Sequence, residues 1–230
     1  MRHRLEHATE RLDAPHHDRA VLEESLDQVA EINRLLGGTR AVLRTLDRLP
    51  LPARSVDILD IGTGSADIPI AIDAWARRRS RTVRITATDL HPQMREIAAE
   101  RTAAIPSISV AAANALHLPY VDDSFDVVLL SLTLHHFERD DQIRGLREAA
   151  RVARRAVIVN ELERSLPNYI GARILARTRW RRNQLTRHDG PLSVLRAFTR
   201  HELHDIATVA GLDVRWVRRH FFFRLIMVLR

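Results

Sequence analysis

The sequence predicts an α/β fold: a doubly wound, mostly parallel seven-stranded sheet, preceded by a helical lid. Short runs rich in Val, Ile and Leu alternate with segments whose apolar residues recur at helical spacing, which indicates right-handed strand–helix–strand units. The first apolar run, 56–61, also passes through Gly62 and Gly64 into a helical pattern that contains Pro69 in its first turn. A strand, a tight glycine turn and a helix therefore follow one another without a break.

Two amphipathic helices are expected before this first strand. Apolar residues recur at helical spacing over 22–36, where a Gly-Gly pair ends the run, and again over 39–49, before a proline. Residues 1–20 are polar and are expected to be loose or only loosely helical. Helices in this position tend to cover the ligand end of such a sheet. Residues 20–50 are therefore candidates for a substrate lid, and a plain packing role fits them equally well.

Strands and helices alternate after the glycine turn. The sequence predicts helices at 68–75, 92–103 and 141–152 and strands at 83–89, 108–112, 124–131 and 156–160. A basic stretch, 161–196, then interrupts the alternation where this architecture often inserts a substrate cap. A helix at 200–210 and two strands at 214–220 and 222–229, expected to pair in antiparallel fashion, close the sheet.

Composition narrows the classes of protein that the chain can belong to. Its 230 residues, 45% of them hydrophobic, suffice for the core of one domain. The absence of cysteine excludes disulfides, thiolate metal sites and a cysteine nucleophile, and agrees with a reducing cytoplasm. No secretory signal is recognised, and no apolar stretch approaches the roughly 20 residues of a membrane span. We therefore expect a soluble, cytoplasmic protein.

The net charge of +7 and the isoelectric point of about 11.1 raise the question of nucleic-acid binding. All 36 basic residues are arginines, which is more typical of codon bias than of a binding design. Dense clusters occur at 77–81 and 177–182, and solvated arginines near helix ends explain them better than a phosphate track. Nucleic acid is therefore disfavoured as a partner, while an anionic substrate or a membrane surface stays open for the second cluster.

The glycine turn itself separates two classes of cofactor. A dinucleotide fingerprint has its third glycine where this chain has Asp67, whose carboxylate would repel a pyrophosphate. The pattern Asp60-x-Gly62-x-Gly64-x-Ala66 instead resembles the first motif of class I S-adenosylmethionine (SAM) methyltransferases. In that family the acidic residue and the glycine loop receive the methionine end of the cofactor. Many members have glycine at the position of Ala66, and alanine is the smallest replacement.

The resemblance continues at the ends of the next strands and implies a Rossmann-like methyltransferase fold. Asp89 matches the acid that takes both ribose hydroxyls of SAM, and Leu90 would pack on the adenine. Asn114-Ala115 stands where the family usually shows Asp-Ala, so asparagine keeps an acceptor but loses the charge. The implied cofactor site comprises Asp60, Gly62, Thr63, Gly64, Asp67, Asp89, Leu90, Asn114, Ala115 and Ser131.

The exit of the fourth strand, 131–137, should face the transferred methyl group. It lacks the Asn/Asp-Pro-Pro-aromatic motif of base N-methyltransferases and carries His135-His136, as in several small-molecule methyltransferases of quinone, sterol and polyketide type. Either histidine is a candidate general base for a hydroxyl acceptor. Packing against the cofactor, or capping the next helix, is an equally good role for one of them. No metal is expected, because neighbouring histidines do not easily face one ion and no third ligand is evident.

A second candidate constellation is the stretch 187–191 together with Asn160 and Glu161 at the end of the fifth strand. His188 offers a further base and Asp189 an orienting acid, although neighbouring side chains usually diverge. The combination resembles uncharacterised bacterial members of the same family. That similarity implies no substrate.

These observations predict a SAM-dependent methyltransferase that acts on a small aromatic or hydrophobic acceptor, with a hydroxyl oxygen as the favoured target. A single domain is expected, with a lid at 20–50, a SAM-binding core at 52–160, a substrate cap at 161–196 and closing elements at 197–230. Two alternatives stay open: an RNA or protein methyltransferase that uses the arginine clusters, and a non-catalytic SAM- or nucleotide-binding regulatory protein. Asp67 disfavours a nicotinamide dehydrogenase. A homodimer is compatible with the sequence.

Overall fold

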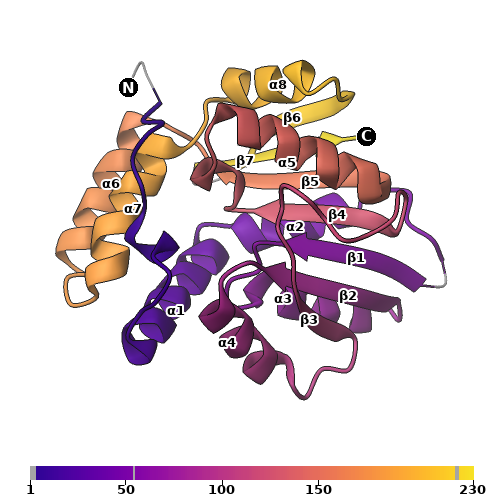
Figure 1. Ribbon diagram of the computed structural model, residues 1–230, viewed down its shortest axis with the longest axis horizontal. Helices are drawn as coiled ribbons and strands as arrows, with labels where there is room; N and C mark the ends of the chain where they lie inside the picture. The colour runs from indigo at the N-terminus through magenta and orange to yellow at the C-terminus, as the bar shows by residue number, and fades with distance from the viewer. Residues whose placement is uncertain (1–3, 54, 221–222) are drawn as a thin grey trace.

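The computed structural model describes residues 4–53, 55–220 and 223–230 and contains one mixed sheet with helices on both faces (Figure 1). The strands are β1 (Ser55–Ile61), β2 (Thr82–Asp89), β3 (Ile108–Ala112), β4 (Phe125–Ser131), β5 (Ala153–Leu162), β6 (Val214–His220) and β7 (Arg224–Leu229). The helices are α1 (Arg19–Leu35), α2 (Gly38–Leu46), α3 (Asp67–Arg77), α4 (Pro92–Thr102), α5 (Arg139–Val152), α6 (Leu166–Arg177), α7 (Gln184–Arg196) and α8 (Arg200–Val209). Two short 3-10 turns, η1 (Arg11–Asp13) and η2 (Leu134–His136), lie in connecting segments.

The seven strands lie in the order β3-β2-β1-β4-β5-β7-β6. Neighbours from β3 to β5 pair in parallel, whereas β7 is antiparallel to both β5 and β6. The fold class expected from the sequence is thus confirmed, including the antiparallel closing pair. The chain reverses its winding direction between β1 and β4, and the carboxyl ends of strands at such a switch point are where doubly wound sheets bind ligands.

Each face of the sheet buries its own apolar core. On one face, α2 and α3 pack on the sheet through residues such as Leu46 and Trp75. On the other, α5 and α8 contribute Leu146 and Leu203, and Figure 1 shows these two helices side by side across β5 to β7. Because the strands are covered on both sides, they read as near-continuous apolar runs in the sequence.

A third, smaller core lies beyond the carboxyl ends of the strands. Leu22 and Leu26 of α1 meet Met94 and Ile97 of α4 and Leu185 of α7 there. In Figure 1 the hairpin of α6 and α7 stands clear of the sheet, with the N-terminal segment running along α7 toward α1. These elements enclose the end of the sheet at which β1, β2 and β4 finish.

Most element boundaries agree with the sequence pattern to within a few residues. One exception is the Gly-Gly pair: Gly37 takes φ 81° and ends α1, whereas the next glycine already begins α2. The α6–α7 hairpin makes up most of the basic stretch 161–196. In the predicted last strand, residue 222 lies outside the described residues. No helix in the described part of the chain is long and apolar enough to cross a membrane.

The N-terminal segment differs from the loose stretch that its polarity suggests. Leu5 N–H donates to the Leu195 carbonyl at 3.1 Å, and the Arg4 guanidinium donates to the carbonyls of Arg196 and His135. Farther along, the N–H groups of Arg11 and Leu12 both donate to the Asp189 carboxylate. Backbone N–H groups and the Arg4 side chain thus fix this segment to α7, which hydrophobic periodicity does not reveal.

Candidate functional site

A cavity of about 700 Å³ lies at the carboxyl ends of β1, β2 and β4. Its floor is the glycine loop after β1, and its walls come from the N-terminal segment, α1, the turn η2 and the α6–α7 hairpin. All of the cofactor residues expected from the sequence line this cavity, and so do both neighbouring histidines: Asp60, Gly62, Thr63, Gly64, Asp67, Asp89, Leu90, Asn114, Ala115, Ser131, His135 and His136. His188 is not part of the wall formed by the described residues.

The glycine loop takes a shape that side chains would oppose. Gly62 has φ 71°, and a Cβ there would lie 2.6 Å from Thr133 Oγ1. Gly64 has φ 55° and donates its N–H to Asp89 Oδ2 at 2.9 Å, while Thr63 N–H donates to the Thr88 carbonyl. The loop is therefore held against the end of β2, with the two glycines bare toward the cavity.

Ala66 occupies the position where a third glycine is common in the resembled motif. It is fully buried and adopts φ 59°, in the left-handed region, just before α3 begins. That conformation costs an L-residue roughly 1–2 kcal/mol. Alanine is thus accommodated with local strain, and the loop keeps the conformation that a glycine would adopt more easily.

Acidic side chains line the floor of the cavity. Asp60 is 2% exposed, its Oδ1 has no hydrogen-bond partner among the described residues, and burial, with the charges of Asp67 and Asp89, raises its pKa to about 7. Asp67 accepts a hydrogen bond from Asn33 Nδ2 at 3.0 Å, and burial raises its pKa as well. Carboxylates that are buried at this cost are typical of binding sites.

Asp89 ends β2 with both carboxylate oxygens directed at backbone donors. Oδ2 accepts from Gly64 and Oδ1 from His91, each at 2.9 Å, and each oxygen keeps a further lone pair. Burial raises the pKa of Asp89 despite these two bonds. Leu90 beside it is 64% exposed although it lines the cavity, so an apolar surface is presented where a planar ring could pack.

Asn114 and Ser131 lie at the ends of β3 and β4. The side-chain oxygen Oδ1 of Asn114 accepts the N–H of Leu116 at 2.9 Å and so stabilises the turn that follows. The side chain still has its amide N–H groups and a second lone pair on Oδ1 for a ligand in the cavity. The Ser131 hydroxyl accepts from Asn160 Nδ2 at 2.8 Å, and Asn160 Oδ1 is buried without a partner among the described residues.

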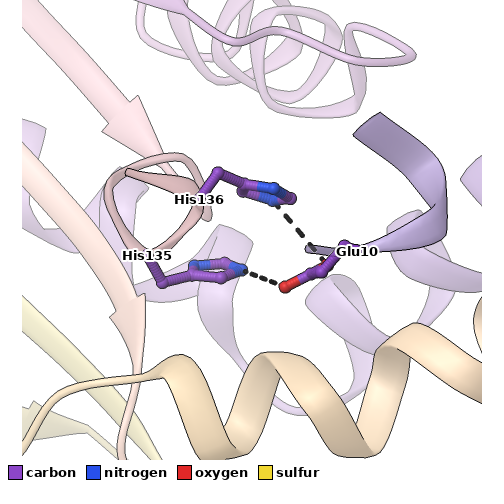
Figure 2. Close-up of side chains that lie close together, drawn as sticks. All are labelled: Glu10, His135 and His136. Atoms are coloured by element: carbon purple, nitrogen blue, oxygen red, sulfur yellow. Dashed lines mark ion pairs between the residues drawn. The ribbon is translucent and has the colours of Figure 1, made fainter. Parts of the chain in front are cut away.

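The two neighbouring histidines converge on Glu10 of the N-terminal segment (Figure 2). His135 Nε2 lies 3.6 Å from Glu10 Oε1, and His136 Nε2 lies 3.9 Å from Glu10 Oε2. On their other sides, His135 Nδ1 lies 2.7 Å from Glu161 Oε2 and His136 Nδ1 lies 2.9 Å from Asp13 Oδ1. Each imidazole is thus held between two carboxylates.

Burial and ion pairing shift the pKa values of His136 and Glu161 in opposite directions. Burial opposes a charge on His136, but Glu10 and Asp13 outweigh it and raise the pKa of His136 to about 9. Burial alone would raise the pKa of Glu161, yet the His135 imidazole holds it below its usual range. Glu161 Oε1 also accepts the backbone N–H groups of Leu134 and His135, so one carboxylate fixes both the turn η2 and its first histidine.

Arg224, the first residue of β7, is a buried cation in the cavity wall. It is 1% exposed, and its Nε and Nη1 have no hydrogen-bond partner among the described residues. Burial lowers its pKa to about 10, although the carboxylates of Asp67 and Glu161 act in the opposite direction. A buried guanidinium with free donors is suited to an anionic group of a ligand.

The second constellation expected from the sequence separates in space. His188 is exposed and pairs with Asp189, with 2.6 Å between Nδ1 and Oδ1; Asp189 lines the cavity, whereas His188 does not. Asp189 also anchors the N-terminal segment, whereas Glu161 belongs to the His135 cluster. We therefore do not carry His188 into the functional proposal below.

Comparison with known proteins shows a similarity over the central part of the chain. Residues 58–156 match the family model described as a methyltransferase domain. The matched segment contains the glycine loop, Asp89, Asn114 and the two histidines. This part of the chain is therefore similar to a methyltransferase domain, and the match covers less than half of the chain.

Curated relatives match less than half of the chain. A ubiquinone/menaquinone biosynthesis C-methyltransferase of Rickettsia akari is 30% identical over 105 residues, which cover 44% of this chain and 42% of the relative. A demethylmenaquinone methyltransferase of Deinococcus radiodurans is 35% identical over 96 residues, 41% of this chain and 37% of the relative. The chain thus spans less than half the length of these relatives.

Solved structures extend the likeness of the fold to nearly the whole chain. A SAM-dependent methyltransferase from Aquifex aeolicus has a TM-score of 0.65 at 15% identity, covering 93% of this chain and 98% of that one. A protein of the same description, qualified there as putative, from Methanococcus maripaludis has a TM-score of 0.63 at 15% identity, covering 94% and 96%. At this identity the likeness concerns the fold alone.

The residues of the cavity fit SAM, the cofactor that the similarity to methyltransferases implies. The unpartnered Asp60 oxygen and the Asp67 carboxylate suit an ammonium and a sulfonium, and the free Arg224 donors suit a carboxylate. Gly62 and Gly64 leave the loop backbone bare for close approach. These side chains therefore offer an opposite charge to each charged group at the methionine end of SAM.

The raised pKa of Asp60 gives a prediction for the unliganded protein. Unfolding returns this carboxyl to its ordinary pKa near 4, so between about pH 4 and 7 the folded state binds more protons than the unfolded one. The free energy of unfolding should therefore fall across this range through Asp60, and level off above it. Melting temperatures from pH 4 to 8 test this: Asp60→Asn should remove that part of the slope. Parallel curves for both proteins would contradict it.

Glu10, Glu161 and Arg224 were not foreseen in these roles. Glu10 lies in a segment that its polarity marks as loose, and Arg224 is one arginine among many. The sequence indicates Glu161 only as part of the second constellation, with His188. A charged residue inside an apolar strand end, as at Glu161 and Arg224, is the one signal that the sequence offers, because burial of such a group is costly without a partner.

Proposed function

We propose that the chain transfers the methyl group of SAM to a small hydrophobic acceptor that carries a hydroxyl group. The observation that supports this most is His135, which lines the same cavity as the glycine loop and pairs with the buried Glu161. A base fixed by an acid, at one end of a cofactor cavity, is the arrangement that proton removal from a hydroxyl requires.

In this proposal Asp60 and Asp67 receive the ammonium group of the cofactor and Arg224 its carboxylate. Asp89 accepts hydrogen bonds from the two ribose hydroxyls, and Leu90 packs on the adenine. Asn114 binds the adenine edge through its amide, with Ala115 leaving room beside it. Thr63 and Ser131 contribute hydroxyl groups to the same wall. The bound cofactor supplies a methyl carbon that the sulfonium makes electrophilic.

His135 takes the acceptor proton at Nε2. Glu161 accepts a hydrogen bond from Nδ1–H, which sets the tautomer so that Nε2 carries the free lone pair on the side of Glu10. The histidine is 2% exposed, and hydrogen bonds from Arg4 and Arg196 to its carbonyl hold the turn in place. A rigid, water-poor base of this kind contributes alignment as well as proton transfer.

The acceptor site is the part of the cavity between α1 and the α6–α7 hairpin. Its wall there is largely apolar, with Leu26, Val29 and Ile32 on one side and Leu175 and Trp180 on the other. Such a wall favours a hydrophobic acceptor over a nucleic acid or a protein chain. Loss of a proton from a phenolic hydroxyl places negative charge on both oxygen and ring carbons. The base therefore serves O- and C-methylation, and the curated relatives carry the names of quinone C-methyltransferases.

Transfer of radiolabelled methyl from SAM tests the proposal. The acceptor panel should contain naphthoquinols, substituted phenols and a sterol, with bulk tRNA and a mixed protein extract as the alternatives. We expect label in an aromatic hydroxyl compound and position-specific product by mass spectrometry. Label in RNA or protein alone, or SAM binding without transfer to any acceptor class, would contradict the proposal.

A further inference from the structure

Three side chains from two distant segments direct their free ligand atoms at one point of the cavity wall. One atom each of Glu10, His135 and His136 lies within 4.8 Å of the others, and Figure 2 shows both imidazoles turned toward the carboxylate. Neighbouring histidines usually diverge, but the 3-10 turn η2 brings these rings to a centroid distance of 4.5 Å with planes tilted by 34°. We propose that Glu10, His135 and His136 bind a single divalent transition-metal ion.

The far nitrogen of each imidazole is already occupied in the way that metal sites require. His135 Nδ1 pairs with Glu161 and His136 Nδ1 with Asp13, which leaves both Nε2 atoms on the side of Glu10. A histidine that ligates a metal almost always gives its second N–H to a carboxylate or carbonyl, which fixes the ring and raises its basicity. This feature occurs here on both histidines.

One oxygen of the carboxylate between them lacks a hydrogen-bond partner among the described residues. Glu10 is 3% exposed, and its Oε1 has no hydrogen-bond partner among the described residues. Its other oxygen accepts a hydrogen bond from Ser193 at 2.9 Å, and Arg196 Nε lies 3.9 Å from Oε1, beyond hydrogen-bond distance. A buried carboxylate oxygen left in this state is costly, and an ion would satisfy it.

The spacing is close to that of a loaded site. Zinc ligands at about 2.0–2.2 Å in tetrahedral geometry lie roughly 3.3–3.6 Å apart. His135 Nε2 lies 3.6 Å from Glu10 Oε1 and His136 Nε2 lies 3.9 Å from Glu10 Oε2, and one ligand atom of each residue lies within 4.8 Å of the others. Two imidazoles and one carboxylate suit Zn²⁺, Fe²⁺ or Co²⁺ better than Mg²⁺ or Ca²⁺, which prefer oxygen ligands alone. Three protein ligands also leave a position open on the cavity side.

The open position gives the ion a role that rests on the proposed function. An acceptor hydroxyl bound there loses its proton more easily, because a divalent cation stabilises the resulting oxyanion. In the metal-bound protein His135 Nε2 is a ligand, so the ion activates the hydroxyl in place of this base and the released proton passes to a water molecule. Metal binding itself does not depend on this role, so the two ideas can fail separately.

Titration of the full chain with Co²⁺ tests the site, after removal of any affinity tag and treatment with a chelator. We expect visible d–d bands at one equivalent, which Zn²⁺ abolishes by displacement. Glu10→Gln and His135→Gln should each weaken Co²⁺ by more than 100-fold, and Asp13→Asn by 10–100-fold, as for the loss of an outer carboxylate. His201→Gln, an exposed histidine paired with Asp205, is the matched control and should bind as wild type.

Two results would overturn the inference. One is a wild-type protein that shows no bands and no saturable heat with Co²⁺ or Zn²⁺. The other is a set of Glu10→Gln and His135→Gln variants that keep their melting temperature and bind the metal as tightly as wild type. Binding of S-adenosylhomocysteine, measured on the same samples, reports on the cofactor site separately and shows whether the proposed function fails as well.

Discussion

Replacement of His135 by glutamine should lower the rate of methyl transfer by about 10²–10⁴-fold, the usual contribution of a positioned general base. Glutamine has similar polarity and nearly the same reach, so the turn η2 should persist through the bonds of Arg4 and Arg196 to its carbonyls. The turnover number with the best acceptor of the panel measures the effect. Affinity for S-adenosylhomocysteine should stay within about threefold of wild type, because the change lies away from the glycine loop.

The control for this prediction is His201→Gln on α8, where an exposed histidine also pairs with a carboxylate. We expect wild-type turnover from that protein. If His135→Gln retains more than about a tenth of the rate, proton removal does not depend on this residue. If it loses affinity for S-adenosylhomocysteine in the same proportion as turnover, the residue supports the cofactor site and is not the base.

Replacement of Arg224 by methionine should weaken S-adenosylhomocysteine by at least tenfold, because hydrogen bonds to charged groups contribute about 1.5–3 kcal/mol each. The same variant should bind 5′-methylthioadenosine as wild type does, because that nucleoside lacks the amino-acid end. Calorimetric titration with the two ligands separates these outcomes.

The comparison variant for Arg224→Met is Asp89→Ala, which should weaken both ligands because both contain the ribose. An equal loss for the two ligands in Arg224→Met would mean that the arginine only supports the fold of the cavity wall. An unchanged affinity for both would remove Arg224 from the cofactor site.

The fold was predictable because its signals are local. Val56 to Ile61 form a continuous apolar run, as expected for a strand covered on both faces, and Pro92 marks the first turn of α4. The glycine loop was predictable for the same reason, since Gly62 and Gly64 are needed where φ is positive. The positions of Asp89 and Asn114 were predictable as well, because each stands at or just after the end of a strand that its own apolar run indicates.

The His135 cluster was only half visible in the sequence. The histidine pair attracted notice, but its partners come from residues more than 20 positions away: Glu161 at the end of β5 and Glu10 in the N-terminal segment. Polarity alone assigns residues near Glu10 to a loose segment, whereas hydrogen bonds to Asp189 and Leu195 hold it on α7. The expectation that no metal is present rested on the lack of a third ligand, and Glu10 is that ligand in our proposal.

The most direct test of the account is calorimetric titration of the purified chain with S-adenosylhomocysteine, set beside NADH and repeated on Asp89→Ala. The account predicts saturable binding of the nucleoside, no measurable binding of NADH, and at least a tenfold loss of affinity in Asp89→Ala. A chain that ignores S-adenosylhomocysteine, or that binds NADH more tightly, would contradict the assignment of the glycine loop and of every cofactor residue built on it.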